Sequence, residues 1–343
     1  MSGTSLDGLD LAYCIFNEVD GHWSFSIERA ETIPYSQQWK NRLTGLMQAT
    51  KEEILSADID LGEYIGEAVK GFIAKHGLKI DFVASHGHTI YHEPERKLTL
   101  QIGHGARISS INGLTVIYDF RSKDVSMGGQ GAPLVPVGDR MLFGKYGYCL
   151  NLGGIANVSF EAQGRRTAFD ICPANMVLNR LAEENGQAFD DHGAMAKEGH
   201  LIPGMLKQLE SLSYYQLSGP RSLGREWVEE NIFPILTAYK DHGTQQLLAT
   251  FTEHIACRVS DVIPYKGKSM LVTGGGAYND YLMSRLQHHC DARIEVPGNT
   301  LVEYKEAMIF AFLGLLRLKG INNVLGSVTG AGKDHCSGKV IYP

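Results

Sequence analysis

Three glycine-rich segments, each following a run of residues typical of a strand, are the part of this sequence best suited to chemistry. Their residues are Gly3, Thr4, Ser5, Leu6, Asp7 and Gly8; Asn151, Gly153 and Gly154; and Gly274, Gly275, Gly276 and Asn279. Glycine allows close backbone approach, and a helix that starts after such a loop offers unpaired N–H groups to an anion. A single loop of this kind is usually a turn, but three together predict a nucleotide triphosphate site.

The side chains in these loops are of the types that such a site needs. Thr4 and Ser5 carry hydroxyl donors, and the backbone N–H groups of Gly153 and Gly154 can donate from an opposing wall. A magnesium ion bridges phosphates in most such sites, and the carboxylate of Asp7 could reach it through water. A nucleoside triphosphate and Mg²⁺ are therefore the predicted ligands of the three loops.

Two better-known phosphate motifs do not fit. The segment 326–334 resembles a P-loop, but it has five residues between the framing glycines and no Ser or Thr after Lys333. The loop that starts at Gly274 lacks the spacing of a dinucleotide-binding fingerprint, because Asn279 stands where a small residue is required.

Strand-like and helix-like segments alternate in two similar series, which predicts a duplicated α/β architecture with an interdomain cleft. Helical periodicity marks residues 37–49, 60–75, 176–185, 226–239, 245–262 and 302–318. Strand-like runs cover residues 9–16, 82–85, 98–101, 114–117, 148–160 and 269–273. No low-complexity linker separates the halves, so we expect a hinge near residues 123–130.

Composition excludes several classes of protein. Hydrophobic residues make up 43% and charged residues 20%, as in globular proteins, and the apolar run 307–316 is too short to span a membrane. A net charge of −6 without a basic stripe argues against nucleic acid as a partner. The start of the sequence does not resemble a secretory signal, which predicts a cytoplasmic protein. A homodimer is the default expectation for any self-association.

Seven sequence blocks together resemble one known family, and they cover essentially the whole chain. They read MSGTSLDGLD, SHGHTIYHEP, YDFRSKDVSMGGQGAPLVP, NLGGIANVS, FDICPANM, SLGREW and VTGGGAYN. They closely resemble anhydro-N-acetylmuramic acid kinases of the actin-like and hexokinase-like superfamily. The resemblance implies two ribonuclease-H-like domains, which we expect at residues 1–125 with 321–343 and at residues 126–320.

The resemblance also implies a reaction and a catalytic base. Family members use water and ATP to open 1,6-anhydro-N-acetylmuramic acid and release N-acetylmuramic acid 6-phosphate during cell-wall recycling. The carboxylate that matches the family's general base is Asp170, which we expect at the end of a strand. The competing interpretation is a turn or cap aspartate, and Asp190 and Asp191 are the next candidates.

Three further residues resemble family positions in the sugar site. Arg121 has a planar guanidinium that could hold the sugar's lactyl carboxylate or orient Asp170, although a surface salt bridge is the alternative. Thr89 and Glu306 match positions that line the sugar pocket, and Glu303 on the same helix face competes with Glu306.

The sequence departs from the family at several places. His88 replaces the usual glutamine of an HGQT block, which disfavours a metal site at His86, His88, His92 and Glu93. ICPAN replaces TGPGN after Asp170, and SLGR replaces STGR, which could change substrate preference. Family members usually carry a short apolar strand before the MSGTSLDG block, and without it neighbouring strands would lack a partner.

Two other functions stay open from sequence alone. A kinase of the same fold for another sugar or small acid would keep the ATP loops and change the pocket. A nucleotide-dependent sensor of muropeptide fragments would bind ligands without turnover.

Overall fold

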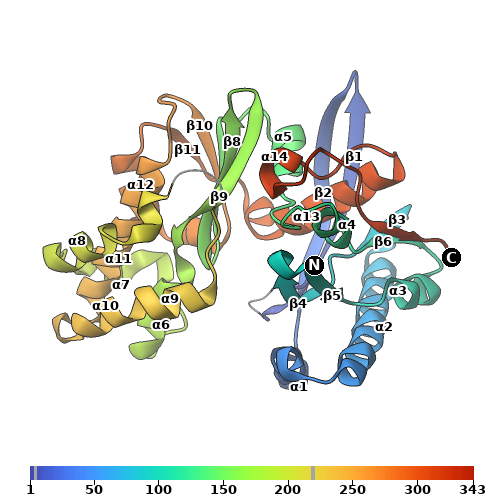
Figure 1. The fold of residues 1–343 in the computed structure, drawn as a ribbon, viewed down its shortest axis with the longest axis horizontal. Helices are drawn as coiled ribbons and strands as arrows, with labels where there is room; N and C mark the ends of the chain where they lie inside the picture. The colour runs from blue at the N-terminus through green and yellow to red at the C-terminus, as the bar shows by residue number, and fades with distance from the viewer. Residues whose placement is uncertain (4–5, 218–220) are drawn as a thin grey trace. The chain divides into compact units, whose positions relative to one another are not determined.

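The computed structural model describes residues 1–3, 6–217 and 221–343, and it confirms the predicted mixed α/β class. The chain forms two compact units: unit 1 comprises Met1–Leu142 and Tyr304–Pro343, and unit 2 comprises Phe143–Glu303 (Figure 1). The domain boundaries expected near residues 125 and 320 stay a prediction. No helix in the described part of the chain is long and apolar enough to cross a membrane.

Unit 2 contains a five-stranded mixed sheet with the strand order β11-β10-β7-β8-β9. Its strands are β7 (Tyr148–Leu152), β8 (Ile155–Ala162), β9 (Arg165–Pro173), β10 (Ser269–Thr273) and β11 (Arg293–Glu295). Strand β8 runs antiparallel to β7 and β9, whereas β7, β10 and β11 are parallel. This order, with the second strand reversed, is that of a ribonuclease-H-like sheet, as the family resemblance implied for this half.

Helices pack around this sheet, and α11 contributes most of its residues to the core. The helices of unit 2 are α6 (Asn175–Glu184), α7 (Ala194–Glu198), α8 (Pro203–Glu210), α9 (Arg225–Asn231), α10 (Phe233–Ala238), α11 (Thr244–Asp261) and α12 (Asp280–His289). The single helix predicted over 226–239 is wrong. Pro234 cannot donate to the preceding turn, so α9 ends and α10 begins with this proline in its first turn.

Unit 1 has three smaller sheets in place of one continuous sheet. Its strands are β1 (Gly8–Val19), β2 (His22–Pro34), β3 (Phe82–Ala84), β4 (His88–Glu93), β5 (Leu98–Ile102), β6 (Thr115–Tyr118) and β12 (Lys339–Ile341). Strands β1 and β2 form the long blue hairpin of Figure 1, β3 and β12 flank β6, and β4 pairs with β5.

The helices of unit 1 include one that is much longer than the periodicity predicted. They are α1 (Gln37–Gly45), α2 (Lys51–His76), α3 (Gly105–Asn112), α4 (Ser122–Ser126), α5 (Pro136–Leu142) and α14 (Gly326–Thr329), and α13 (Asn299–Leu318) enters this unit at Tyr304. Helix α2 begins nine residues before the predicted residue 60, because Thr50 and Glu53 form a capping box. It ends at Gly77, whose φ of 61° is left-handed.

A cavity of about 230 Å³ lies between β1 and β3, which belong to different sheets. Its walls are β1 from Leu9 to Phe16, residues 79–85, and apolar side chains of α2 and α13 such as Phe72 and Phe310. Met1 also lines the cavity. The facing edges of β1 and β3 are therefore separated by an apolar space with helices around it.

Candidate functional site

The two glycine loops of unit 2 lie side by side, because they follow the carboxyl ends of the neighbouring parallel strands β7 and β10. Asn151 is paired with Thr273, the last residue of β10. Gly274 has a φ of 86°, and a Cβ there would lie 2.7 Å from Asn151 Oδ1. A Cβ at Gly276 would lie 2.7 Å from Leu152 Cβ. Both positions therefore need glycine for the loops to touch. Ligands bind at this end of strands in α/β sheets.

Helix starts complete this edge of the sheet. The carbonyl of Gly154 accepts from Met176 N at 3.1 Å, which joins the second glycine loop to the first turn of α6. Asn279 caps α12, since its side chain accepts from Leu282 N at 2.8 Å. Gly275 and Gly154 are exposed, whereas Asn279 is buried. Contact of Asn279 with a nucleotide stays a prediction, and its observed role is to begin the helix.

The first glycine loop belongs to unit 1. The hydroxyl donors predicted in it, Thr4 and Ser5, lie outside the described residues. On either side of them, Leu6 N donates to Gly3 O at 3.3 Å, and Leu6 has a φ of 60°. The side chain of Asp7 is exposed to solvent. Its carboxylate is therefore accessible to a hydrated cation.

Gly8 closes this loop and starts β1. A Cβ there would lie 2.5 Å from the Ile33 carbonyl oxygen of the paired strand β2. Only glycine fits such a close approach of two backbones. The end of the loop is thus held directly against the hairpin.

Asp170 does not lie at a strand end as predicted, because β9 continues to Pro173. It sits beside a β-bulge: Asp170 is paired with Asn157 and Cys172 with Ala156, so Ile171 has no partner of its own on β8. A bulge of this kind turns side chains away from the regular alternation and is common next to active sites. The fixed position that we expected of the base therefore comes from the bulge.

Backbone and ring contacts hold Asp170 on several sides. Its Oδ2 accepts from Leu223 N at 2.9 Å, and its backbone oxygen accepts from Tyr214 OH at 2.7 Å. Burial raises the pKa of Asp170, and the hydrogen bond from Leu223 opposes this shift only in part. A carboxylate with a raised pKa and one anchored oxygen is suited to accept a proton.

The two departures from the family pattern both border Asp170. Ile171 is fully buried, so no threonine hydroxyl stands beside the carboxylate. Leu223 replaces a threonine, but its contact with Asp170 is made by the backbone N–H, which any residue except proline supplies. Ala174, which stands where the family pattern has glycine, has a φ of −133°, which does not require glycine. The anchoring of Asp170 thus survives both changes.

Arg121 is held by a histidine and a backbone carbonyl in unit 1. Its Nε and Nη2 lie 3.0 and 2.9 Å from His86 Nε2, and its Nη1 donates to Gly131 O at 2.7 Å. Neither contact is the surface salt bridge that we weighed as the alternative. Burial lowers the pKa of Arg121, and the nearby carboxylate of Glu306 opposes that shift.

Glu306 and Thr89 also lie in unit 1. Desolvation by the surrounding protein raises the pKa of Glu306, and the charge of Arg121 opposes this shift. The Glu306 side chain is still accessible to solvent. Glu303, the competing carboxylate, instead accepts from Tyr278 OH at 2.9 Å. Thr89 is half-buried on β4 opposite Gln101. Arg121 and Glu306 are therefore electrostatically coupled, as side chains of one site would be.

A buried carboxylate that the sequence analysis missed fixes the segment around Gly131. Asp124 is fully buried, and its Oδ2 accepts from Gly131 N at 2.7 Å while its Oδ1 accepts from Thr329 Oγ1 at 2.8 Å. The same Gly131 residue accepts from Arg121 through its carbonyl. Asp124 therefore stabilises the segment that orients the arginine. In the sequence, the signal that could have indicated Asp124 is its position three residues after Arg121, about one helical turn away.

Helix α9 begins at Arg225, one residue before the helical periodicity that starts at residue 226. Arg225 Nε pairs with Glu229 Oε1 at 2.7 Å on the exposed helix surface. Glu226 is exposed in the first turn. The Arg225–Glu229 pair lies within the helix and therefore has a structural role.

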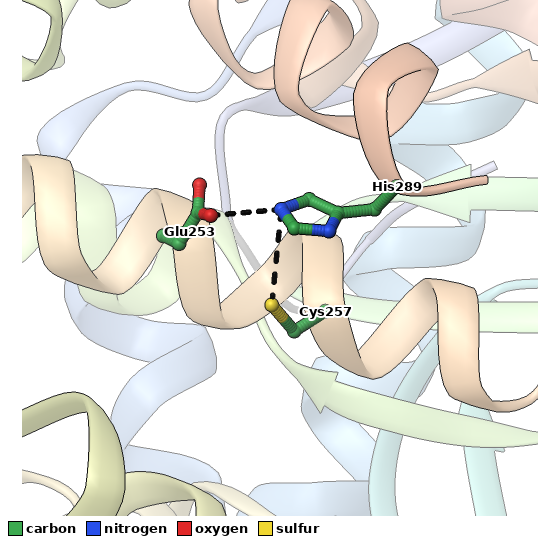
Figure 2. A group of neighbouring side chains, drawn as sticks. All are labelled: Glu253, Cys257 and His289. Atoms are coloured by element: carbon green, nitrogen blue, oxygen red, sulfur yellow. Dashed lines mark hydrogen bonds and ion pairs between the residues drawn. The ribbon is translucent and has the colours of Figure 1, made fainter.

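Metal-ligand side chains approach one another at one place within the described residues, and it is not the histidine group that the sequence analysis disfavoured as a metal site. Glu253, Cys257 and His289 have potential ligand atoms within 4.8 Å of one another (Figure 2). However, Arg285 donates to both oxygens of Glu253, at 2.6 and 2.9 Å, and its Nη2 lies 3.4 Å from His289 Nε2. A guanidinium already supplies the positive charge there, so we interpret the group as an ion pair joining α11 to α12.

Comparison with known proteins gives consistent matches over the full chain. A family model described as anhydro-N-acetylmuramic acid kinase matches residues 1–343. A protein of that name from Pseudomonas putida is 36% identical, covering 96% of this chain and 95% of the relative. One from Aliivibrio fischeri is 33% identical, covering 100% and 98%.

Solved structures match more distantly. A ROK family glucokinase from Streptomyces griseus, in complex with glucose and AMPPNP, has a TM-score of 0.35 and 10% identity, covering 83% of this chain and 94% of that one. Component A of (R)-2-hydroxyglutaryl-CoA dehydratase from Acidaminococcus fermentans has a TM-score of 0.36 and 14% identity, covering 59% and 78%.

Proposed function

This chain belongs to the anhydro-N-acetylmuramic acid kinase family, and from that membership we propose how its residues carry out the reaction. The activity is an ATP-dependent sugar phosphorylation in cell-wall recycling. The substrate is 1,6-anhydro-N-acetylmuramic acid, and the product is N-acetylmuramic acid 6-phosphate.

The proposed reaction has two coupled parts. The oxygen of a water molecule bonds to the anomeric carbon, and the bond from that carbon to the bridging oxygen breaks. The bridging oxygen stays on carbon six and takes the γ-phosphoryl group of ATP, which leaves as ADP. Asp170 accepts the proton that the attacking water loses. The observation that carries this assignment is its carboxylate beside a bulge, held at one oxygen by Leu223 N and with its pKa raised by burial.

The remaining roles follow the two units. We assign all three glycine loops to the binding of ATP. Between them, the two adjoining loops of unit 2 and the loop of unit 1 would contact its phosphates and its adenosine. Arg121 provides a planar fork for the lactyl carboxylate of the sugar, and Thr89 and Glu306 contact the sugar ring. Asp7 offers an exposed oxygen ligand of the kind that Mg²⁺ prefers, and would hold the ion through water. When bound, the ion neutralises phosphate charge.

A panel of sugars tests the proposed function. We expect anhydro-N-acetylmuramic acid to drive ADP release, whereas N-acetylmuramic acid, N-acetylglucosamine and glucose do not. The measurement is a coupled assay of ADP at saturating ATP, with product phosphorylation checked by mass spectrometry. Turnover of another sugar with none of the anhydro-sugar would contradict the proposal, and tight binding without any turnover would favour a sensor.

The pH dependence of kcat/KM should report the protonation of Asp170. A base acts only when deprotonated, and burial raises the pKa of Asp170 above the ordinary aspartate value of 3.8. Activity should therefore fall as pH drops through this raised pKa, and the acid limb should lie above pH 3.8. Protonation of a group whose pKa is raised by folding favours the folded state, so this limb should precede any acid unfolding followed by circular dichroism. An acid limb that coincides with unfolding would contradict the assignment.

We place the enzyme in the cytoplasm, where ATP is available, and propose that it has two domains. A homodimer stays the default expectation for self-association. Size-exclusion chromatography with light scattering would measure its mass directly.

A further inference from the structure

We propose that His86 and His88, two residues apart in one segment, position the two substrates separately: His86 orients the Arg121 guanidinium for the sugar, and His88 anchors the glycine loop of unit 1 for ATP. This inference rests on the proposed function of Arg121 and of that loop. Both histidines are positioning residues, since each acts through another group.

His86 is a neutral imidazole whose tautomer is fixed by its partners. Arg121 can only donate, and two of its nitrogens lie within 3.0 Å of His86 Nε2, so Nε2 is an acceptor. His86 Nδ1 lies 3.0 Å from the Gly87 carbonyl, which can only accept, so Nδ1 carries the proton. Burial and the Arg121 charge hold the pKa of His86 well below its usual value. The ring also packs on Phe310, with centroids 4.6 Å apart.

His88 ends a buried chain of hydrogen bonds that starts at Tyr35. Tyr35 OH donates to Ser2 Oγ at 2.8 Å, and Ser2 Oγ lies 3.0 Å from His88 Nδ1. Ser2 Oγ accepts from the tyrosine, and it can donate its own proton to His88 Nδ1 when the imidazole carries its proton on Nε2. Burial lowers the pKa of His88 to about 4, so it is neutral and can accept. The three side chains are each no more than 5% exposed.

This chain of hydrogen bonds holds both ends of the first glycine loop. Ser2 precedes Gly3 and forms an isolated bridge with Leu9 on β1. At the other end, the backbone N–H of Tyr35 donates to Asp7 O at 3.3 Å. Tyr35 therefore bonds to both ends of the loop. Its hydroxyl donates to Ser2, which precedes Gly3, and its backbone N–H donates to Asp7 near the loop's end. His88 Nδ1 is the last polar atom of this chain and the buried partner of Ser2 Oγ.

The two histidines sit on a segment that has little freedom to move. Gly87 has a φ of 71°, and a Cβ there would lie 2.2 Å from the Ile102 carbonyl oxygen. His88 is paired with Ile102 in the β4–β5 sheet. The backbone between the two rings is therefore pinned against β5. This segment therefore places the His86 ring against Arg121 and the His88 ring against Ser2.

Substitutions that remove one acceptor at a time should each weaken the binding of one substrate and leave the other unaffected. His88→Leu should raise the KM for ATP, and the Kd for ADP measured by calorimetry without sugar, by about tenfold or more, because Ser2 loses its buried acceptor. Its KM for the sugar should stay within about threefold. His86→Leu should show the reverse pattern, with the KM for the sugar raised and ADP affinity unchanged.

Conservative variants provide the matched controls. The amide oxygen of His88→Asn occupies the place of Nδ1, and that of His86→Gln the place of Nε2, so each should restore the affected constant to within about threefold of the parent. Tyr35→Phe removes one hydroxyl and little packing, and should weaken ADP binding even if His88→Leu fails to fold. If His86→Leu fails to fold, His86→Asn, whose shorter amide does not reach the place of Nε2, replaces it alone and together with Arg121→Lys: the two changes should be non-additive in the KM for the sugar.

Several outcomes would overturn the proposal. They are equal shifts of both KM values in either leucine variant, no rescue by the amide variants, or unchanged ADP affinity in Tyr35→Phe. Failure of the proposed function would look different, since the parent protein would then release no ADP with the anhydro-sugar. The calorimetric comparison of ADP binding would still test His88 in that case.

Discussion

Replacing Asp170 with asparagine is expected to lower sugar-dependent ADP formation by roughly 10²–10⁴-fold, the usual contribution of a general base. Asparagine keeps the shape of the side chain and an oxygen that can accept from Leu223 N, which lies 2.9 Å from Asp170 Oδ2. It removes the only group assigned to take the proton of the attacking water. The affinity for ATP should stay near that of the parent, because the loss concerns the transition state. The measurements are kcat from the coupled assay and ADP binding by calorimetry.

The neighbouring carboxylates supply the controls for this experiment. Both oxygens of Asp190 accept backbone N–H groups, from Met195 at 2.8 Å and Ala196 at 3.0 Å, so it serves the start of α7. Asp191 is exposed, and it lies 3.9 Å from His192 in an ion pair on the surface. Asp191→Asn should therefore keep activity within about twofold. Turnover of Asp170→Asn within tenfold of the parent would show that Asp170 is not the base. Loss of its melting transition would identify a structural aspartate.

Local signals in the sequence predicted the strands β7, β8 and β10 of unit 2, whereas the ribonuclease-H-like fold was implied by the family resemblance and β9 and β11 were not predicted. Short apolar runs ended by glycine mark β7 and β10. The loops that follow these two strands meet in the structure, where Gly274 lies next to Asn151. The strand β2 was not predicted. Trp23, Phe25 and Ile27 alternate with polar residues at its start, a strand signal that the sequence analysis did not use. It exists because β1 supplies a partner along its whole length.

The contacts that fix the site were less accessible from sequence, because they join residues far apart in the chain. His86 and Arg121 are 35 positions apart, and Asp124 and Thr329 are 205 apart. The sequence indicated Arg121 through a family block and considered His86 only as a metal ligand. The hydrogen bond from Leu223 N to Asp170 has no side-chain signature at all. Residue types could therefore nominate the base and the arginine, but not the groups that orient them.

The cavity between β1 and β3 leads to the second prediction with a large effect: an apolar segment of about five residues joined ahead of Met1 should raise the melting temperature. The Met1 ammonium donates to Asp10 O at 2.8 Å, and Asp10 N donates to Met1 O at 2.8 Å. Ser2 bridges Leu9 in the antiparallel sense. A chain continued backwards from Met1 would thus run antiparallel along β1, past Leu11 to Phe16, which line the cavity. Strand geometry of about 3.3 Å per residue gives the length.

Two physical effects favour this extension. Burial lowers the pKa of the Met1 ammonium, which shows that the charged terminus is disfavoured where it lies, and a peptide N–H would remove that charge while still donating to Asp10. Side chains of a strand in this cavity would pack against Phe72 of α2 and Phe310 of α13. Each fully buried valine or isoleucine contributes about 1.5–3 kcal/mol, against a backbone ordering cost of about 1–2 kcal/mol per residue. The new ladder hydrogen bonds add to the gain.

A net gain of 2 kcal/mol would raise the melting temperature by roughly 4–8 °C in a unit of this size. The measurement compares this chain with three extended forms of equal length in differential scanning calorimetry. One carries valine and isoleucine throughout, as suits a strand with helices on both faces. A second replaces two of these residues with aspartate, which would bury charge, and a third places proline in the middle, which removes a ladder donor. Only the apolar form should melt higher, and equal melting of all four proteins would show that the cavity does not accept a strand.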